Sequence, residues 1–324
     1  MRKMNRIACV CSVLLACAAM ASHAQEYPTK PIRFIVPFAP GGGTDLLARA
    51  VAPGMSESLG RQVIVENRTG AGGNIATEYV AKAPADGYTI LLAYIGPIAV
   101  SPSLYKNLGF DPVKDFRGVS LMASIPLVLV VHPSLPVKSV KQLIALAKSR
   151  PGQLSYGSAG NGTAQQLAGE LFKLSTGTNV VAIPYRGGAP ATTALLTGEV
   201  QLLFTGALAV FPHVKVGRLR ALAVTTSKRL PSAPELPTVA ESGVPGFEVV
   251  SWNGVLVPSA TPPAIVTRLH AAATQALAVP ETRERLHAQG LEIVASTPDD
   301  FDRFIKSEIA KWAKVVKAAG LRAE

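Results

Sequence analysis

The chain has 324 residues, 48% of them hydrophobic, and carries a formal net charge of +11. Its basic residues are scattered, without a Lys/Arg-rich run and without interleaved aromatic residues, which argues against a nucleic-acid partner and favours small anions. The length predicts two domains and is ample for a large hydrophobic core. Beyond residue 24, no apolar stretch is long enough to cross a bilayer.

The first 24 residues have the layout of a secretory signal peptide. The start is positive, because it contains Arg2, Lys3 and Arg6. The segment Ile7–Ala21 is then mostly apolar, and Ser22–Ala24 supplies a small-x-small cleavage site. The pattern predicts export to a bacterial periplasm, with cleavage at the end of this site.

Two other interpretations of this segment are a membrane anchor and a lipoprotein signal. The apolar run is shorter than the roughly 20 residues that span a bilayer. Leu14–Cys17 loosely resembles a lipobox, but Leu15 is bulky for its position. Simple cleavage after Ala24 removes all three cysteines and leaves 29 basic against 21 acidic residues, so the mature chain has a net charge of +8 and no disulfide.

After the signal, short β-branched runs alternate with helical patterns, which predicts an α/β fold with largely parallel sheets. Helices are predicted over Asp45–Met55 and Asn74–Ala83, and another begins after Ser139, because Gln142 completes a capping box. The predicted strands, in chain order, cover Arg33–Phe38, Gln62–Glu66, Tyr88–Ala93, Leu154–Tyr156, Val180–Tyr185, Val200–Phe204 and Ala221–Thr225.

The final helix is the most clearly marked. Thr297 is its predicted N-cap, Pro298 takes the first helical position, and Gly320 ends the helix. The pattern predicts a long amphipathic helix. Its apolar face consists of Phe301, Phe304, Ile305, Ile309, Trp312 and Val316.

Two extended apolar segments, Ser124–His132 and Phe247–Pro258, interrupt the alternation of strands and helices. Segments of this kind can cross between two lobes. We therefore predict one lobe from residues 25–124 and 254–324 and a second lobe from residues 125–253, with the signal at residues 1–24 removed.

Glycines cluster at three junctions between a predicted strand and a helix: Pro40–Asp45, Gly70–Asn74 and Gly157–Thr163. Glycine lets a backbone approach a ligand closely, and the helix that follows offers unpaired N–H groups and the positive end of its dipole. In open α/β sheets, ligands bind at the carboxyl ends of strands. Each loop alone is more often a tight turn with a helix cap, but three together indicate a site for a carboxylate or phosphate.

Motifs for nucleotide binding and for catalysis are absent from the sequence. No GxGxxG follows a predicted strand and no Gly-Lys pair occurs, which excludes a P-loop. There is no HExxH and no GxSxG, and the serine of Gly157–Gly160 stands one place too early for a nucleophile elbow. No cluster of metal ligands is visible. We therefore expect no cofactor, no metal and no catalytic residues.

The glycine loops resemble those of a known family. Five of the matching strings are IVPFAPGGGTD (Ile35–Asp45), ENRTGAGGNI (Glu66–Ile75), YGSAGNGT (Tyr156–Thr163), PYRGGAPA (Pro184–Ala191) and SWNGVLVP (Ser251–Pro258). Similar strings follow one another in order over the whole mature chain. The sequence resembles the Bug (Bordetella uptake gene) family of periplasmic substrate-binding proteins, which are associated with tripartite tricarboxylate transporters.

The resemblance implies a two-lobed periplasmic binding fold of the Venus-flytrap kind, type II-like, in which each lobe is a mostly parallel sheet flanked by helices. It also implies that backbone N–H groups of the first glycine loop, and of the loop before the LAGELF helix, hold a ligand carboxylate. The predicted ligand-binding residues on this chain are Phe38, Ala39, Pro40, Gly42, Gly43, Thr44, Asp45, Tyr94, Ser158, Ala159, Gly160, Asn161, Gly162, Thr163 and Thr205.

The resemblance further implies a receptor, expected to be monomeric, that binds a small organic acid and delivers it to separate membrane subunits of a tripartite tricarboxylate transporter. Two alternatives remain open from the sequence. The same clamp would serve a ligand sensor that signals to a membrane kinase, and a periplasmic enzyme would act on the same acid instead of releasing it unchanged.

Three positions depart from the family pattern. Gln166 stands where histidine is common, and Gln201 and Thr205 replace two acids. If Thr205 lies in the cleft, the site lacks a carboxylate that could pair with a ligand ammonium, which favours mono- or dicarboxylates over amino acids. The alternative is that these changes are structural and leave the choice of ligand unaffected.

The predicted processing is testable on exported protein. Because Ser22–Ala24 is a good cleavage site and Cys17 lies in a poor lipobox, the mature chain should begin at Gln25. Intact-mass measurement of the periplasmic protein checks this. A lipid-modified chain that begins at Cys17 would contradict it.

Overall fold

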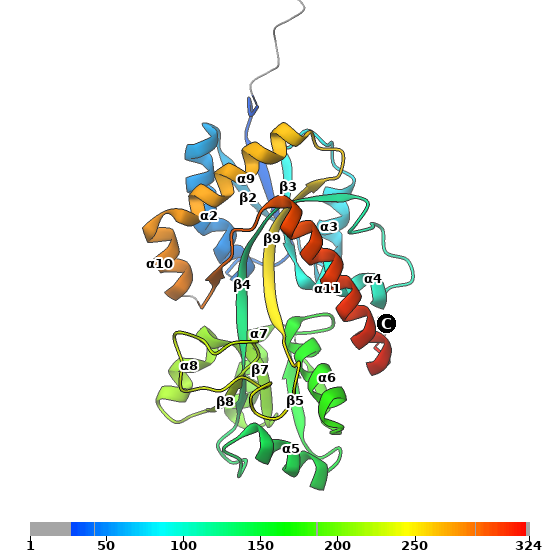
Figure 1. The fold of residues 1–324 in the computed structure, drawn as a ribbon, viewed down its shortest axis with the longest axis vertical. Helices are drawn as coiled ribbons and strands as arrows, with labels where there is room; N and C mark the ends of the chain where they lie inside the picture. Colours follow the sequence, from blue (N-terminus) through cyan, green and yellow to red (C-terminus); the bar gives the residue numbers. More distant parts are fainter. Residues whose placement is uncertain (1–26, 42, 186, 289, 322–324) are drawn as a thin grey trace, which may run out of the picture.

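Two long strands, β4 (Phe116–Val131) and β9 (Val250–Pro258), run side by side through the molecule and join its two lobes (Figure 1). They pair antiparallel, from Phe116 opposite Pro258 to Pro126 opposite Val250. The structure is a computed structural model that describes residues 27–41, 43–185, 187–288 and 290–321. The predicted signal peptide and Gly42 lie outside these residues.

The upper lobe in Figure 1 contains a sheet with the order β2-β1-β3-β9-β4, and the short β10 pairs with β4. Its outer strands β2 (Val63–Asn67), β1 (Ile32–Val36) and β3 (Thr89–Tyr94) are parallel. Side chains of a strand alternate between the two faces of its sheet. On one face, Phe34 therefore packs with α2 and α9, while on the other Ile35 packs with α3 and α11.

The helices of this lobe are α2 (Gly43–Leu59), α3 (Asn74–Ala81), α4 (Ser101–Leu104), α9 (Pro263–Ala278), α10 (Pro280–Ala288) and α11 (Pro298–Ala319), with the short turns η1 (Ala71–Gly73) and η2 (Gly96–Val100); β10 is Glu292–Ile293.

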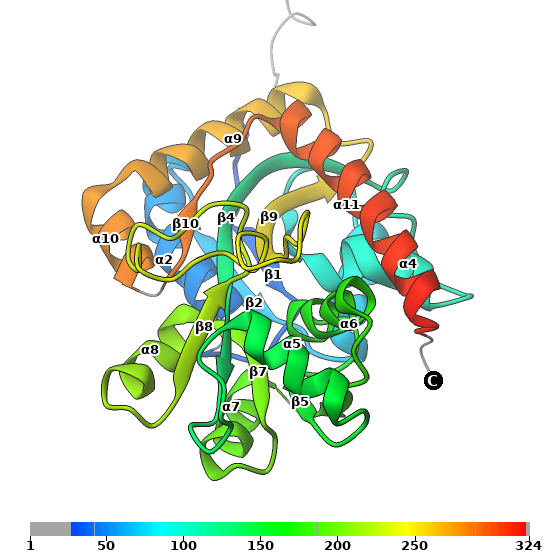
Figure 2. The same cartoon turned by 60° about the horizontal axis from the view of Figure 1, so that its bottom comes forward.

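In the lower lobe, the far end of β4 pairs antiparallel with β7 (Leu202–Gly206) and β8 (Arg220–Val224). Next to β7 lie the parallel strands β5 (Ser155–Ser158) and β6 (Val181–Pro184). The view from below shows α6 and α8 on opposite sides of these strands (Figure 2). The helices of this lobe are α5 (Val140–Ser149), α6 (Ala164–Thr176), α7 (Gly188–Thr197) and α8 (Ala207–Lys215).

The two-lobed α/β architecture predicted from the sequence is confirmed, but the sheets are mixed rather than mostly parallel. The three outer strands of each lobe are parallel, as expected for strands linked through helices. At the centre, β9 runs antiparallel to β3, and β4 runs antiparallel to β7, β8, β9 and β10. The reason is that β4 leads from the upper lobe into the lower lobe and β9 leads back. β9 therefore opposes the outer strands of the upper lobe, and β4 opposes those of the lower lobe.

The final helix, α11, begins and ends as predicted. Thr297 Oγ1 accepts a hydrogen bond from the Asp300 N–H at 3.2 Å, and Gly320 ends the helix with a φ of 63°. The helix packs on β4 and reaches α6 of the lower lobe (Figure 1). Its buried Glu308 Oε2 accepts hydrogen bonds from Trp252 Nε1 at 3.0 Å and from Trp312 Nε1 at 2.9 Å. Glu308 therefore ties α11 to the crossing strand β9.

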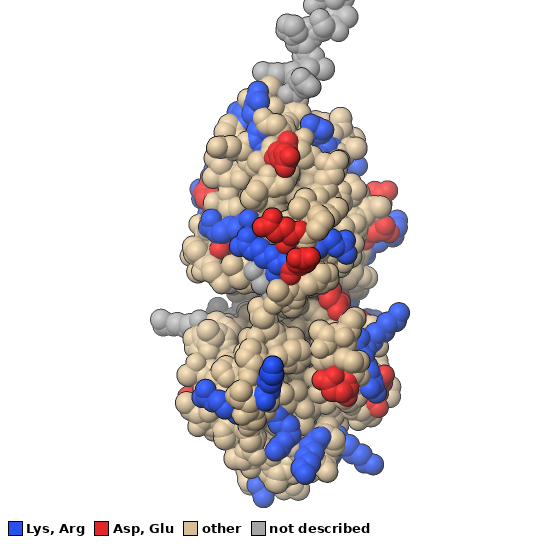
Figure 3. All heavy atoms as spheres, turned by 90° about the vertical axis from the view of Figure 1, so that its left-hand side faces the viewer, with Lys and Arg blue, Asp and Glu red and all other residues tan. Residues whose placement is uncertain are grey.

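The surface agrees with the scattered charge seen in the sequence. On the face drawn in Figure 3, Lys and Arg lie on both lobes and are mixed with Asp and Glu. Within the described part of the chain, no helix has both the length and the apolar character needed to cross a membrane.

Candidate functional site

The first glycine loop joins β1 to α2 at the junction of the lobes. Gly41 has a φ of 86°, a left-handed conformation that favours glycine. Of the predicted residues, Ala39, Pro40 and Gly43 are exposed, Phe38 is half-buried, and Thr44 and Asp45 are buried; Gly42 lies outside the described residues. The first N–H groups of α2 have no partner within the helix, so this loop presents donors to the junction.

The side chain of Asp45 holds this loop in place. Asp45 Oδ2 accepts hydrogen bonds from the Gly41 N–H and from Arg49 Nε, both at 2.9 Å, and Oδ1 accepts one from Asn67 Nδ2 at 2.8 Å. Asn67 also donates to the Phe38 carbonyl at 2.9 Å. The Asp45 carboxylate is thus turned into the loop, and only its backbone is left for a ligand.

The pKa of Asp45 reflects these contacts. Burial of the carboxyl acts to raise its pKa, but the hydrogen bonds from Arg49, Gly41 and Asn67 favour the charged form and together lower the pKa below its ordinary value. The loop therefore depends on an ionised carboxylate.

The third glycine loop lies between β5 and α6 in the lower lobe. Gly160 and Gly162 have φ values of 120° and 74°. Thr163 caps α6, because its Oγ1 accepts a hydrogen bond from the Gln166 N–H at 3.4 Å and donates one to the Gly160 carbonyl at 2.7 Å. Gln166 Oε1 in turn accepts the Gly162 N–H at 2.7 Å, and its Nε2 donates to Asn161 Oδ1 at 3.1 Å. The Gly162 N–H therefore has a partner within the loop.

The second glycine loop, Gly70–Asn74, meets the other two. A Cβ built on Gly72 would lie 3.9 Å from the Asn161 carbonyl oxygen, and one on Gly73 would lie 3.6 Å from the Phe38 ring. The sequence predicted this loop as a possible anion site but not as part of the list of binding residues. The clustered glycines of Gly70–Asn74 were the sequence signal that groups this loop with the other two glycine loops.

The lobes touch where these loops meet. A Cβ on Gly96, in η2 of the upper lobe, would lie only 3.0 Å from the carbonyl oxygen of Gly162 in the lower lobe. Beside this contact, the rings of Phe38 and Tyr94 meet edge to face with centroids 5.0 Å apart. Burial raises the pKa of Tyr94, against the lowering effect of hydrogen bonds from the Ser251 hydroxyl and the Ala164 N–H. Tyr94 of the upper lobe is thus in contact with the first residue of α6.

The other predicted residues of the lower lobe border the same junction. Ser158 is buried at the end of β5, Ala159 is half-buried, and Asn161 is exposed. Thr205 is buried near the end of β7, opposite Val128 of β4. These positions agree with the strand-end locations expected from the sequence.

Gln201 lies at the opposite end of β7, just before the strand begins. Its Oε1 accepts hydrogen bonds from the Ser155 N–H at 2.9 Å and from the Ser155 hydroxyl at 3.1 Å. This departure from the family pattern has a structural role, because it joins the first residues of β5 and β7 away from the glycine loops.

Two buried asparagines at the junction were not predicted as site residues. Asn253 lies in β9 opposite Tyr94 and is completely buried, and Asn74 is buried at the start of α3. The Oδ1 atoms of both have no hydrogen-bond donor among the described residues. For Asn253, the sequence signal was a polar residue within the mostly apolar SWNGVLVP segment. Buried polar groups normally have hydrogen-bond partners, so a polar residue in such a segment is notable.

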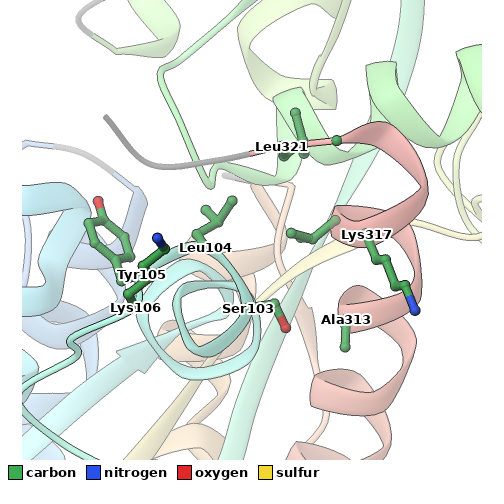
Figure 4. A pocket seen from close by; sticks show the side chains of 9 residues that line it. Ser103, Leu104, Tyr105, Lys106, Ala313, Lys317 and Leu321 are labelled. Carbon is green, nitrogen blue, oxygen red and sulfur yellow. The ribbon is translucent and has the colours of Figure 1, made fainter.

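A large pocket lies outside this junction (Figure 4). Its volume is about 890 Å³, and it opens between α4 and the end of α11. The glycine loops contribute none of its lining residues, which are Ser103, Leu104, Tyr105, Lys106, Ala313, Val316, Lys317, Gly320 and Leu321. This pocket is therefore separate from the place where the glycine loops meet.

The junction offers hydrogen-bond donors and dipole ends rather than reactive side chains. The N-termini of α2 and α6 come from opposite lobes, and each follows a glycine loop. Within residues 27–41, 43–185, 187–288 and 290–321, no three His, Cys, Asp or Glu side chains are grouped so that they could hold a metal ion. Such an arrangement can bind an anion between the lobes.

The role of Asp45 leads to a pH-dependent prediction. Its folded pKa lies below the ordinary value of 3.8, so its contribution to stability is complete above that value and is lost as the pH falls through the folded pKa. Asp45→Asn should lower the free energy of unfolding by about 1–2 kcal/mol at pH 7, and the difference should shrink below about pH 4. Urea unfolding at a series of pH values measures it.

The exposed Glu284 on α10 provides the control. Glu284→Gln should stay within about 0.5 kcal/mol of the parent. Equal stability of Asp45→Asn and the parent at pH 7 would show that the carboxylate does not order the loop.

Comparison with known proteins places the chain in a family. Residues 47–321 match the model of the tripartite tricarboxylate transporter family receptor. The chain is 41% identical to Protein BugT of Bordetella pertussis over 322 residues, which cover 98% of this chain and 99% of BugT.

Two solved structures of similar proteins carry organic acids. The structure of Rpa4515 of R. palustris with adipate has a TM-score of 0.83 and 42% identity, over 91% of this chain and 99% of that chain. MatC (Rpa3494) from Rhodopseudomonas palustris with bound malate has a TM-score of 0.80 and 31% identity, over 90% of this chain and all of that chain. The chain therefore belongs to the family of tripartite tricarboxylate transporter receptors.

Proposed function

We propose that this protein is a periplasmic solute receptor that clamps a small mono- or dicarboxylate between its lobes and hands it to the membrane subunits of a tripartite tricarboxylate transporter. The observation that carries the proposal is the meeting of three glycine loops, with the N-termini of α2 and α6 facing the junction from opposite lobes. Helix N-termini favour anions, and two from separate lobes favour closure around one anion.

The similar structures support a carboxylate as the ligand. Rpa4515 was solved with adipate and MatC with malate, both of which are dicarboxylic acids. We infer that backbone N–H groups of Gly43–Asp45 and of Ser158–Asn161 contact the carboxylate here. The side chain of Asp45 and the N–H of Gly162 have other partners and are assigned to holding the loops.

We propose that the receptor releases its ligand unchanged. The histidines support this: His132 Nδ1 lies 2.7 Å from the Ser134 hydroxyl, and His270 Nε2 lies 3.1 Å from the Ser296 carbonyl oxygen. None of these residues belongs to the glycine loops. A monomeric receptor, exported to the periplasm and cleaved after Ala24, completes the proposal.

We also propose that the lobes divide at residues 124/125 and 253/254. The partners of the crossing strands support these limits. On β4, Ser124 still pairs with β10 of the upper lobe, whereas Leu127 pairs with β7 of the lower lobe. On β9, Gly254 and the next residues pair with β3 of the upper lobe, and Asn253, opposite Tyr94, lies at the limit itself.

Binding of organic acids tests the function directly. A mono- or dicarboxylate present at about 100 times its dissociation constant should stabilise the protein by about 2.7 kcal/mol. This raises the melting temperature by several degrees. A thermal-shift screen of organic acids, with amino acids as the comparison set, measures the effect. A melting shift with amino acids alone would contradict the proposal, and NMR of the bound acid should detect no turnover.

Closure of the lobes is testable at Gly96. A Cβ there would press on the Gly162 carbonyl only while the lobes are in contact. Gly96→Ala should therefore weaken ligand binding roughly tenfold, because overpacking acts against the closed state. Calorimetry with an acid identified in the screen measures the dissociation constant.

Gly188, the first residue of α7, serves as the matched control, because the nearest atom to its built Cβ is Gln165 Nε2 at 3.8 Å. Gly188→Ala should bind like the parent. If Gly96→Ala also binds like the parent, the ligand does not bring these two loops together.

A further inference from the structure

A groove follows one side of α11. The pocket between α4 and the end of α11 (Figure 4), of about 890 Å³, shares Tyr105 and Lys106 with a second pocket of about 520 Å³. The second pocket shares Pro112 and Val113 with a small third pocket of about 70 Å³. The three pockets together form one groove between α11 and residues 102–116, which we call the α11 groove.

The floor of the α11 groove is a mostly apolar stripe of the helix itself. Residues three or four positions apart lie on the same face of a helix. The stripe keeps this spacing and consists of Ile305, Ile309, Ala313, Val316 and Gly320. It is roughly 22 Å long, which equals about four helical turns. The groove therefore has the length and the floor to take a helix of a partner along α11.

The rim of the α11 groove is basic. Lys106, Lys306 and Lys317 line it, and all three are exposed. None of them forms an ion pair with a carboxylate of the described residues. An occupant with carboxylates would therefore find cations along the whole groove.

The acidic residues of the α11 groove are held by backbone groups instead. Asp115 Oδ2 accepts a hydrogen bond from the Asp111 N–H at 2.7 Å, and Asp111 Oδ1 accepts one from the Val113 N–H at 2.9 Å. At the other end, Asp302 Oδ1 accepts the Gly118 N–H at 2.7 Å. The lysines are thus the charges that remain for a partner, and they complement an acidic one.

The α11 groove also adjoins the contact between the lobes. Leu104, which lines it, has its Cδ1 atom 3.6 Å from a Cβ built on Gly162 of the lower lobe. On the other side of the groove, α11 packs on α6 of the lower lobe. Both walls therefore touch the lower lobe while the lobes are in contact, and a partner in the groove meets elements whose surroundings change when the lobes separate.

We propose that the α11 groove docks an acidic amphipathic helix of the transporter's membrane subunits. The inference rests on the proposed function and adds the docking surface and the chemistry of the contact. Apolar side chains of such a helix fill the stripe, while its carboxylates meet the lysines. A symmetric dimer through this groove would set lysines against lysines. A flat bilayer would not reach a floor on which Ile305 and Val316 are each 3% exposed.

Uptake into proteoliposomes tests the α11 groove apart from the ligand site. The vesicles hold the membrane subunits, and the receptor is added outside with a labelled acid from the thermal-shift screen. Lys106→Glu/Lys317→Glu should lower the initial rate of uptake about tenfold at low salt, because carboxylates would then face carboxylates. By calorimetry, the dissociation constant of the acid should stay within about twofold of the parental value.

The matched control is Lys148→Glu/Lys228→Glu. It makes the same change of charge at two exposed lysines of the lower lobe that do not line the groove. This variant should support uptake like the parent.

Two further variants test the occupant. Ala313→Trp fills the floor without a change of charge and should lower uptake at low and high salt alike, because salt does not screen a steric block. Ser103→Cys, labelled with a photoreactive maleimide, should cross-link to an acidic and apolar segment of a membrane subunit, which mass spectrometry identifies. All three natural cysteines precede the predicted cleavage site, so the label is unique to this position.

The outcomes separate the two proposals. Parental uptake by the groove variants, an equal loss in the control, or a cross-link to a basic segment would each overturn the docking site and leave the receptor function standing. So would loss, in the lysine variant, of binding to phosphatidylglycerol vesicles or of self-association in sedimentation while uptake persists, because the groove would then serve lipid or a second copy. Failure of every acid to bind, or acid binding without uptake by the parent, would overturn the receptor function itself.

Discussion

The antiparallel pairing of β4 with β9 is the constraint on which the rest of the structure depends. Both strands pass from one lobe into the other, and their pairing extends from Phe116 opposite Pro258 to Pro126 opposite Val250. The outer strands of each lobe then assemble against this pair, so that the loops after β1, β3 and β5 reach one junction. Glu308 adds α11 to the same framework through Trp252.

Within that framework, charged and amide side chains shape the loops, while backbone groups remain to meet a ligand. Asp45 orders the first glycine loop and Gln166 orders the third. Neither residue places a net charge in the junction, because Asp45 is paired with Arg49. This division suits an anionic ligand: fixed dipoles can bind it without an opposing buried charge that would be costly when the site is empty.

Much of this arrangement was predictable because its signals are local. Strand positions follow from β-branched runs, and the caps at Ser139 and Thr297 follow from the preference of hydroxyls for unpaired helix N–H groups. The glycine loops were recognised from composition alone, since a φ such as the 74° of Gly162 is costly for other residues. The two lobes followed from the apolar crossing segments.

By itself, the sequence determined the strands, the helix caps, the glycine loops and, through resemblance, the family. Only the tertiary structure decided that the sheets are mixed, that Gln166 takes the Gly162 N–H, and that Asn253 Oδ1 is left without a donor. The physical reason is that propensity and capping act over a few residues of chain. Whether a polar atom finds a partner depends instead on groups brought close by folding, as Asn253 meets Thr44 across more than 200 positions of sequence.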